Sequence, residues 1–444
     1  MSKGASCLVL KTGYKNISKK LSEHLDSLSI GAHIFILCKN EYDDNSIIKN
    51  SVLDVIDLAL TFKLDYINTL VIPQECNSAD SILYGVWLSK DRKSMKLNKD
   101  AIREKHIWKD VEWGKREKNY NPLGKDPGNV WIPTEDDGKG KITRHVVLSE
   151  KQVIDRILKL TDSIKSAIVC VEELSGGCVE TTIKGRETPP YPLINSYEVV
   201  FDTSESMKKI RKKSVELVVT SPPYWDLKNY LKKGQIGQES YETYQGRMTS
   251  VWNECYNKLS DTGLLWININ IRTKNGKLIP IANDIVSNCK KLGFYFKGIF
   301  IWHKSSGIPT GEKNIVDRFE FVLVFSKNEK QVLKNLNFSD YKNENLNGKF
   351  IWNINRKAGS VGKKFIHTAI YPNQLTDRAI ILSTNPGNVV CDPFLGSGTT
   401  LISAINKGRS FVGYEYNEQF EELIKYRIGN ECNDRNKVKF VKQC

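Results

Sequence analysis

The stretch SVELVVTSPPYWDL, residues 214–227, joins an apolar run to groups that could hold a flat polar ligand. Val215 to Val219 has the composition of a buried strand in a parallel sheet. Two prolines then end the strand, because proline has no N–H for the sheet ladder. In open α/β sheets, ligands bind at the carboxyl ends of strands. These groups suit a planar ring that carries an amine, unless the stretch is only a surface turn. The acceptors are the Ser221 hydroxyl and the Pro222 carbonyl, and the flat faces are those of Tyr224 and Trp225.

A second stretch, GNVVCDPFLGSGTTLISAINKGRSFVGYEYN at residues 387–417, has the pattern of a strand, a glycine-rich turn, a helix and another strand. Gly396 and Gly398 let a ligand approach the backbone, and Glu415, at the end of the second strand, is placed to accept both hydroxyls of a ribose. The stretch is neither the dinucleotide fingerprint GxGxxG nor a P-loop, since no GK[ST] follows the glycines. It therefore favours a nucleoside without phosphates, unless the glycines form only a tight crossover.

Together, TSPPYW and DPFLGSGTT resemble the motifs of DNA amino-methyltransferases that use S-adenosylmethionine, and the resemblance covers about residues 195–430. The catalytic motif precedes the cofactor motif by roughly 170 residues, which resembles the β order of that family. The resemblance implies an α/β methyltransferase (Rossmann-like) fold with a mixed seven-stranded sheet. It implies a base-holding set of Ser221, Pro222, Pro223 and Tyr224, and a cofactor-binding set of Asp202, His367, Thr368, Asp392, Pro393, Phe394, Gly396, Ser397, Gly398, Thr399 and Glu415.

Two parts of the cofactor set depend on looser matches. Asp202 follows YEVVF, where the family usually has Gly before the acid and this chain has Phe201. FIHTAIYPNQLTDRAI resembles the segment before the cofactor strand, which implies that His367, Thr368 and Tyr371 lie near the methionine end of the cofactor. The alternative for His367 is a structural role.

The residue before the prolines bears on which base is methylated. Family members that act on the cytosine amine commonly have Ser there, and those that act on adenine commonly have Asp or Asn, so Ser221 favours the N4 amine of cytosine. Adenine N6 stays open as the alternative, because Ser also occurs in some adenine enzymes. No cysteine lies in the motif, so the ring-carbon chemistry that needs a covalent nucleophile is not indicated. An amine inside a duplex is reached by flipping the base out, and Tyr224 is the expected stacking face.

Length and composition restrict the class of protein. The chain has 444 residues, enough for two or three domains, with 40% hydrophobic and 26% charged residues. No apolar run approaches the roughly 18 to 20 residues of a membrane span, and the amino-terminal segment lacks a signal-peptide pattern. Ten cysteines without a CxxC pair and six histidines without ligand spacing argue against a disulfide framework or a metal site. We therefore expect a cytoplasmic protein without metal, and the resemblance implies that its source is a bacterium or an archaeon.

The net charge of +15, with a pI of about 9.1, favours a polyanionic partner. The resemblance makes that partner double-stranded DNA, and it implies a restriction–modification system with a cognate endonuclease acting on the same site. The alternative reading of the charge is a Lys- and Asn-rich composition that reflects only an AT-rich genome.

The first half of the chain repeats the pattern of the second. Three matches are SIGAHIFILCKN with DTGLLWININ, RHVVLSEKQVIDRIL with IHTAIYPNQLTDRAI, and IVCVEELSGGCVETTIKGR with VVCDPFLGSGTTLISAINKGR. We therefore predict a degenerate methyltransferase-like copy over 1–190 and a catalytic domain over 191–444. The later matches are offset by about 220 residues, and the earlier ones drift by several residues. The counterpart of Ser221 is therefore expected before residue 1. At the cofactor strand, Asp-Pro-Phe-Leu is replaced by Val171 to Leu174. The copy is predicted to be inactive.

Two fused copies are expected to form a pseudo-dimer within one chain. The first half then helps to hold DNA, or, as the alternative, only stabilises the second. The polar segment 303–366 is the candidate DNA-recognition region. An alternative of another class is a catalytically inactive nucleic-acid-binding protein that keeps the fold.

Overall fold

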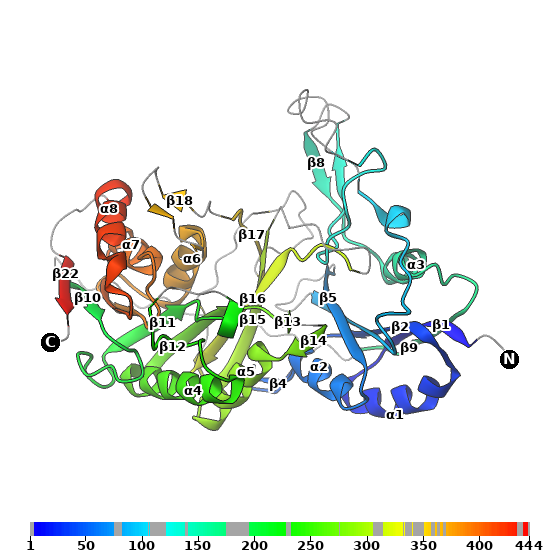
Figure 1. The fold of residues 1–444 in the computed structure, drawn as a ribbon, viewed down its shortest axis with the longest axis horizontal. Coiled ribbons are helices and arrows are strands. Elements are labelled where there is room, and N and C mark those ends of the chain that lie inside the picture. Colours follow the sequence, from blue (N-terminus) through cyan, green and yellow to red (C-terminus); the bar gives the residue numbers. More distant parts are fainter. Residues whose placement is uncertain are drawn as a thin grey trace.

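The protein contains two α/β sheets, each built mainly from one half of the chain (Figure 1). The computed structural model describes residues 4–74, 82–104, 106, 121–137, 141–174, 195–227, 232–274, 276–304, 314–331, 333, 340, 350–356, 360–361, 365–366, 370–432 and 438–442. No helix within these ranges is both long enough and apolar enough to cross a bilayer.

The second half forms a sheet in the order β17-β15-β16-β12-β11-β20-β21-β10-β22. Of these strands only β16 is antiparallel to its neighbours. The strands are β10 (Tyr197–Phe201), β11 (Val215–Thr220), β12 (Leu259–Ile269), β15 (Tyr295–His303), β16 (Phe319–Ser326), β17 (Ile351–Asn353), β20 (Val389–Asp392), β21 (Ser410–Glu415) and β22 (Val438–Lys442).

The prediction of seven strands was therefore wrong for the described residues, in which the sheet has nine. The two strands at the edges, β17 and β22, account for the difference. Strands β16 and β17 also correct the prediction of a polar segment over 303–366. All of β16 lies within that range, is mostly buried and pairs with β12 and β15, and Ile351 and Trp352 of β17 are buried and pair with β15. Most of the rest of that segment, including 305–313 and 341–349, lies outside the described residues.

Helices cover both faces of this sheet, because the central strands are apolar on both faces (Figure 1). Along β11, Val218 packs into the cluster that contains α4 and α5, whereas Leu217 and Val219 pack into the cluster that contains α6, α7 and α8. The helices are α4 (Tyr241–Lys258), α5 (Ile281–Lys291), α6 (Asn373–Ser383), α7 (Thr399–Asn406) and α8 (Glu421–Glu431). Two short 3-10 turns are η4 (Trp225–Leu227) and η5 (Glu418–Phe420). Two small hairpins pair β13 (Arg272–Lys274) with β14 (Lys277–Ile279), and β18 (Ser360–Val361) with β19 (Phe365–Ile366).

The first half forms a five-stranded sheet in the order β5-β6-β2-β1-β9. Strands β1, β2 and β9 are parallel, and β6 is antiparallel to both of its neighbours. The elements are β1 (Ala5–Lys11), α1 (Tyr14–His24), η1 (Leu25–Ser27), β2 (Leu28–Cys38), β3 (Glu41–Tyr42), β4 (Ile48–Asn50), α2 (Val52–Leu60), β5 (Asp65–Pro73), β6 (Ile82–Ser89), η2 (Lys99–Ile102), β7 (Thr134–Asp136), β8 (Ile142–His145), α3 (Glu150–Leu160) and β9 (Ala167–Val171).

The order and directions in this five-stranded sheet match those of β15-β16-β12-β11-β20 in the larger sheet. The irregularities match as well. The pairing of β1 with β2 shifts register between Ala5 and Cys7, and the pairing of β11 with β12 shifts between Val215 and Leu217. The antiparallel pair at the outer side of each sheet also has one register shift: β5 with β6 in the first half, and β15 with β16 in the second.

This correspondence corrects the predicted position of the counterpart of the Ser-Pro-Pro-Tyr motif. Because β1 occupies the place of β11, that counterpart is Lys11-Thr-Gly-Tyr14, directly after β1, and does not fall before residue 1. The sequence comparison misplaced it because the segment that joins the two strands is shorter in the first half, 16 residues between β1 and β2 against 38 between β11 and β12. Most of this difference lies before the helix.

The two halves pack through equivalent elements. Helix α2 contacts α5, while β5 contacts β14 and β4 contacts β15. Asn283 of α5 donates through Nδ2 to Leu53 O at 2.8 Å and to Asp57 Oδ1 at 2.7 Å, both on α2. One buried apolar cluster contains side chains of both halves, among them Ile56 and Ile285. The halves therefore share part of their core.

The halves also contact each other through the segment before β7. Gly128 forms a parallel bridge with Val316, and the guanidinium of Arg318 donates to Asp126 O at 2.9 Å. A Cβ on Gly128 would lie 2.6 Å from Cδ of Arg318, which is itself buried. Only glycine fits this close approach.

Gly128→Ala should therefore destabilise the protein by about 1–3 kcal/mol through overpacking, measured as a lower midpoint in urea unfolding. The matched control is Gly246→Ala, in the interior of α4, where a Cβ meets nothing within 4 Å. That control should raise stability by about 0.5–1 kcal/mol, because alanine has the higher helix propensity. Equal effects of the two substitutions would contradict this account.

Candidate active site

The predicted site residues from four strands meet at one edge of the nine-stranded sheet. Strands β11, β20, β21 and β10 are parallel neighbours in that order, so their carboxyl ends lie together. Ser221 follows β11, Asp392 ends β20, Glu415 ends β21, and Asp202 follows β10. The structure thus brings together strand ends that are up to 213 positions apart in sequence.

Asp392 is fully buried and joins several elements. Thr220, at the end of β11, donates to Oδ1 at 2.7 Å, and Phe394 N donates to the same oxygen at 3.0 Å. Thr400 of α7 donates to Oδ2 at 2.5 Å, and the Tyr371 hydroxyl lies 3.2 Å from it. Burial raises the pKa of Asp392, while these hydrogen bonds oppose that rise. The carboxyl group of Asp392 thus links the end of β11 to the glycine loop.

The glycine loop that follows makes a tight, left-handed turn. Gly396 and Gly398 have φ of 53° and 84°, in the left-handed region where a side chain is strained. Pro393 and Ser397 are buried, and Thr399 begins α7. The buried Arg427 donates to Ser397 O, Ser397 Oγ and Thr399 Oγ1, each at 2.9 Å. Arg427 therefore fixes the loop through Ser397 and Thr399. Nothing in the sequence indicated this role.

Glu415 lies against this loop. Its Oε2 accepts the Gly396 N–H at 2.7 Å, and its Oε1 accepts the Asn417 N–H at 2.7 Å. Burial raises the pKa of Glu415 to about 7. Each carboxylate oxygen retains a second lone pair, so the predicted contact with ribose hydroxyls is compatible with this arrangement.

Asp202 lies beside Glu415. Its backbone N–H donates to Glu415 O at 3.1 Å, and its Oδ1 accepts the Thr203 N–H at 2.7 Å. Tyr371, from the segment before α6, contacts Asp392 as described. His367 and Thr368 lie outside the described residues, so their predicted roles stay predictions.

The Ser-Pro-Pro-Tyr segment forms the other side of the site. Pro222 and Pro223 are buried, and the Tyr244 hydroxyl of α4 donates to Pro223 O at 2.7 Å. Trp225 has φ of 50°, an uncommon value for a bulky residue, and its Nε1 donates to Glu239 O at 2.9 Å. The ring of Tyr241 packs edge-on against the ring of Trp225, so Trp225 has a packing role.

Three residues beside Ser221 and Tyr224 were missed from the sequence. Glu320 Oε2 accepts both the Tyr224 hydroxyl and Asn268 Nδ2 at 2.7 Å, and Oε1 accepts Lys304 Nζ at 3.0 Å. Asn268 Nδ2 lies 3.5 Å from Ser221 Oγ. The available signal was a single acid inside the apolar strand RFEFVLVFS and a single Asn inside LLWINI.

Within the described residues, no cluster of His, Cys, Asp and Glu is placed to hold a metal ion. The described residues of the site carry hydroxyl, amide and carboxyl groups. Such groups bind a neutral nucleoside portion well.

Part of the chain is similar to known proteins. Residues 215–426 match the family model described as DNA methylase, which spans N6 and N4 methylases. This chain contains a DNA methylase domain. The methyl donor of the family is S-adenosylmethionine. The match includes no residue of the first half.

Similar proteins include Type II methyltransferase M.Cfr9I of Citrobacter freundii, which is 28% identical over 54% of this chain and 89% of its own length. Type II methyltransferase M.MjaI of Methanocaldococcus jannaschii is 29% identical over 53% of this chain and 92% of its own length. Among solved structures, PvuII DNA methyltransferase (cytosine-N4-specific) is 20% identical with a TM-score of 0.43, over 56% of this chain and 97% of its own. A score that low does not establish a shared fold.

The residues at the edge of the DNA methylase domain fit S-adenosylmethionine. The left-handed Gly396 and Gly398 give the loop its tight turn, and Glu415, which holds the Gly396 N–H, offers its remaining carboxylate lone pairs to a ribose. Asp392 does not have the same freedom, because its two oxygens already accept hydrogen bonds from three side chains and one backbone N–H.

Glu415→Gln should change how stability depends on pH. The folded protein holds the Glu415 proton up to about pH 7, whereas the unfolded chain loses it near 4.5. Between these values the wild type therefore loses stability as pH rises, by up to about 1.4 kcal/mol per pH unit. The variant lacks this loss, so its Tm minus that of the wild type should increase from pH 5 to pH 8 in cofactor-free thermal unfolding. An exposed-carboxyl control, Glu422→Gln, should show a constant difference, and a constant difference for Glu415→Gln would contradict the assignment.

Proposed function

We propose that this protein methylates the exocyclic N4 amine of a cytosine that is flipped out of double-stranded DNA, with S-adenosylmethionine as methyl donor. The observation that carries the proposal is the hydrogen bond from Thr220 to Asp392. Thr220 immediately precedes Ser221, and Asp392 begins the glycine loop. The base-holding motif and the cofactor loop are thus joined at neighbouring strand ends.

The methyl donor, when bound, supplies a methyl group on a positively charged sulfur. The chain must then orient the amine and bind its protons as they become more acidic. Ser221 Oγ is a partly exposed acceptor at the end of β11 for one amine N–H. The aromatic face of Tyr224, fixed through its hydroxyl, replaces the stacking that the base loses on leaving the helix.

Ser221 supports cytosine rather than adenine. A hydroxyl is a weaker acceptor than the carboxylate or amide that commonly stands before the prolines in adenine enzymes. Adenine N6 methylation is the alternative within the same fold, because both bases present an amine beside a ring nitrogen. A protein that binds nucleic acid without catalysis is the alternative of another class.

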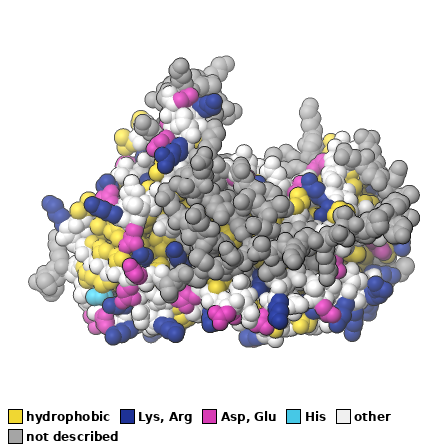
Figure 2. All heavy atoms as spheres, turned by 180° about the vertical axis from the view of Figure 1, so that it is seen from behind, with side chains coloured by type: hydrophobic (Ala, Val, Ile, Leu, Met, Phe, Trp, Pro, Cys, Tyr) yellow, Lys and Arg dark blue, Asp and Glu magenta, His cyan; other side chains and the backbone are white. Residues whose placement is uncertain are grey.

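Duplex DNA as the substrate is supported by the net charge of +15. Lys and Arg side chains lie over both halves of the face in Figure 2, so both halves contribute positive charge. The names of the Type II relatives support a role as the modification enzyme of a restriction–modification system, with a cognate endonuclease, in the cytoplasm of a bacterium or archaeon.

The product should be N4-methylcytosine. Purified protein is incubated with unmodified DNA and S-adenosylmethionine, the DNA is digested to nucleosides, and these are separated by mass spectrometry. N6-methyl-2′-deoxyadenosine in place of N4-methyl-2′-deoxycytidine would support the adenine alternative, and the absence of any methylated nucleoside would support the non-catalytic one. Ser221→Ala should reduce product formation by about 10- to 100-fold while cofactor affinity stays unchanged, because Ser221 is placed toward the base and not the cofactor.

We further propose that the first half, about residues 1–190, is an internal copy that pairs with 191–444 as a pseudo-dimer. Support comes from the shared strand order, the shared register shifts, and the packing of equivalent elements across the two halves. Contacts of Arg318 and Val316 with the segment around Gly128 support a role for this half in holding the second.

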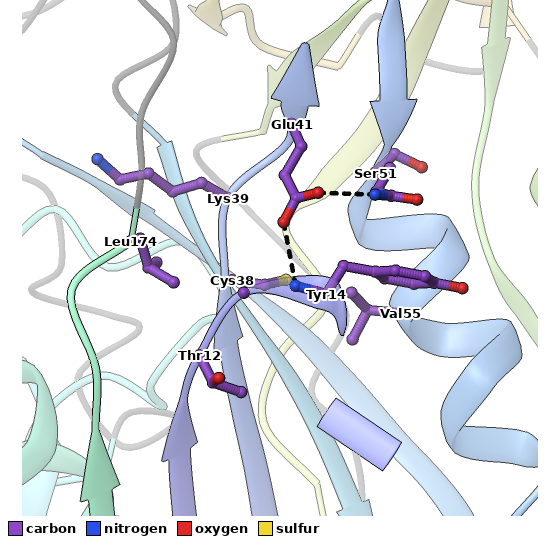
Figure 3. A pocket seen from close by; sticks show the side chains of 10 residues that line it. Thr12, Tyr14, Cys38, Lys39, Glu41, Ser51, Val55 and Leu174 are labelled. Carbon is purple, nitrogen blue, oxygen red and sulfur yellow. Dashed lines mark hydrogen bonds between the residues drawn. The ribbon is translucent and has the colours of Figure 1, made fainter. Parts of the chain in front are cut away.

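The first half is also proposed to be inactive. Its counterpart of the base site is a pocket lined by Thr12, Tyr14, Glu41 and Ser51 among others (Figure 3). Glu41 points into this pocket, where its Oε1 accepts the Tyr14 N–H at 3.0 Å and its Oε2 accepts Asn50 Nδ2 at 2.6 Å. A carboxylate thus stands where β13 of the second half begins with Arg272.

Carboxylates also occupy the end of β9, next to β1. Glu172 Oε2 accepts Thr12 Oγ1, and it accepts Asn16 Nδ2 at 3.2 Å. Lys11 pairs with Glu150. A ligand with its own carboxylate would meet negative charge here, and the rigid Pro-Pro pair is replaced by Thr12 and Gly13.

One S-adenosylmethionine should therefore bind per 444-residue chain. Isothermal titration with the cofactor alone should give a stoichiometry near one, for the wild type and for Ser221→Ala alike. A stoichiometry near two would show that the first half retains a cofactor site.

A further inference from the structure

Tyr224 is held at both ends by residues from other strands. Its hydroxyl donates to Glu320 Oε2 at 2.7 Å, and Glu320 belongs to β16. Its backbone carbonyl accepts a hydrogen bond from Arg272 Nη1 at 3.1 Å, and Arg272 begins β13, shortly after the end of β12. Arg272 also pairs with Asp226, next to the base-holding segment. The position of Tyr224 therefore depends on how the end of β12 lies against the start of β16.

The carboxylate of Asp317 joins these two strands beyond the point where their backbones pair. The pairing of β12 with β16 ends at Ile269 with Phe321. Asn270, directly after β12, donates through Nδ2 to Asp317 Oδ2 at 3.0 Å and to Phe319 O at 3.1 Å. The side chain of Asp317 thus links the strand ends that carry both contacts of Tyr224.

The other oxygen of Asp317 is held by the first half of the chain. Asn129 Nδ2 donates to Asp317 Oδ1 at 3.0 Å. Asn129 lies between the two sheets, because its backbone N–H donates to Val316 O at 3.0 Å and its carbonyl accepts the N–H of Val71, in β5, at 2.8 Å. A residue of the first half is therefore in direct contact with the carboxylate that links β12 and β16.

The amide of Asn129 is fixed in one orientation. Its Oδ1 accepts the backbone N–H of Arg318 at 2.8 Å, and because an N–H can only donate, the oxygen must face it. Both hydrogens of Nδ2 then have acceptors, Asp317 Oδ1 and Asn68 Oδ1, the latter at 2.9 Å. Burial raises the pKa of Asp317, and the charge of Lys304 and the hydrogen bond from Asn129 oppose that rise. Asn129 is 1% exposed, so no water competes for these contacts.

We propose that Asn129 of the first half is a positioning residue of the base site: by holding Asp317, it keeps the end of β12 against the start of β16 and so keeps Tyr224 in place to stack on the flipped base. This inference rests on the proposed function, since it assigns a role toward the base of that same site. Asn129 itself does not touch the base. The first half thus contributes to the active site of the second through one side chain.

The test compares two buried asparagines that join the halves by the same chemistry. Asn129→Asp keeps the size of the side chain and the acceptor for Arg318 N–H, but it replaces the donor toward Asp317 by a second carboxylate oxygen. Asn283→Asp is the matched control. Asn283 also donates through Nδ2 to one carboxylate and one carbonyl of the other half, but it lies between α2 and α5.

The first measurement is hydrogen–deuterium exchange of the full-length, cofactor-free protein at pH 8, where the two carboxyl groups are disfavoured from sharing a proton. Asn129→Asp should speed the exchange of backbone amides within 221–227 by about threefold or more, because repulsion from Asp317 makes local opening easier. Asn283→Asp should keep this exchange within about 1.5-fold of the wild type, even where it lowers the Tm. Equal changes in the two variants, or no change for Asn129→Asp, would overturn the inference.

The second measurement is a rescue. Combining Asn129→Asp with Asp317→Asn exchanges the two groups, so that the amide at position 317 donates to the carboxylate at position 129 and still accepts from Asn270. Asn68 Oδ1 loses its donor in the single and the double variant alike, so their difference isolates the contact between positions 129 and 317. The double variant should fold even where Asn129→Asp does not, and its exchange within 221–227 should return to near the wild-type rate. A double variant no better than Asn129→Asp would contradict the proposal.

The third measurement is the single-turnover rate of methyl transfer to DNA. Asn129→Asp should lower this rate by about 10- to 100-fold with the affinity for S-adenosylmethionine unchanged, because a displaced Tyr224 no longer orients the base. Asn283→Asp should stay within about twofold of the wild type, and the double variant should recover most of the loss. A rate near that of the wild type for Asn129→Asp would overturn the inference. If the wild type itself transfers no methyl group, the proposed function fails, and the exchange measurements still decide whether Asn129 holds the Tyr224 segment.

Discussion

The buried carboxyl group of Asp392 is the interaction on which the rest of the site depends. Hydrogen bonds from Thr220, Thr400, Tyr371 and Phe394 N converge on it, so one side chain joins the ends of β11 and β20, the first turn of α7 and the segment before α6. The base-holding strand and the glycine loop cannot separate without leaving several buried polar groups unpaired. Asp392 therefore fixes the site geometry as well as bordering the cofactor loop.

The second constraint is the distribution of charge across the base site. In the second half, an ionised carboxylate, Glu320, lies behind Tyr224 and Asn268 and is balanced by Lys304. In the first half, Glu41 lines the corresponding pocket and accepts the Tyr14 N–H, and Glu172 accepts a hydrogen bond from Thr12 beside it. The same strand order thus carries its carboxylates in different places in the two halves.

The two halves are also mechanically connected near the base site. Asn129 of the first half donates to Asp317 Oδ1 at 3.0 Å, and Asn270, two residues after Asn268, donates to Asp317 Oδ2 at 3.0 Å. Asp317 lies three residues before Glu320. Because β12 and β16 are paired strands, this bridge sets the ends of both strands that carry the Asn268–Glu320 contact. The first half can in this way support the geometry of the second.

The sequence by itself determined the strand ends that carry Ser221, Asp392 and Glu415, because Pro-Pro, Asp-Pro and the glycine loop are local signals whose backbone consequences need no distant partner. It also indicated the repeat, since apolar periodicity survives divergence. Only the tertiary structure decided that the sheet has nine strands, that Lys11 to Tyr14 is the counterpart of the catalytic motif, and that Glu320 and Lys304 reach Asn268. These depend on edge pairing, on helix lengths and on contacts between distant segments. None of them leaves a local pattern, because a buried acid is tolerated only through partners that the fold brings to it.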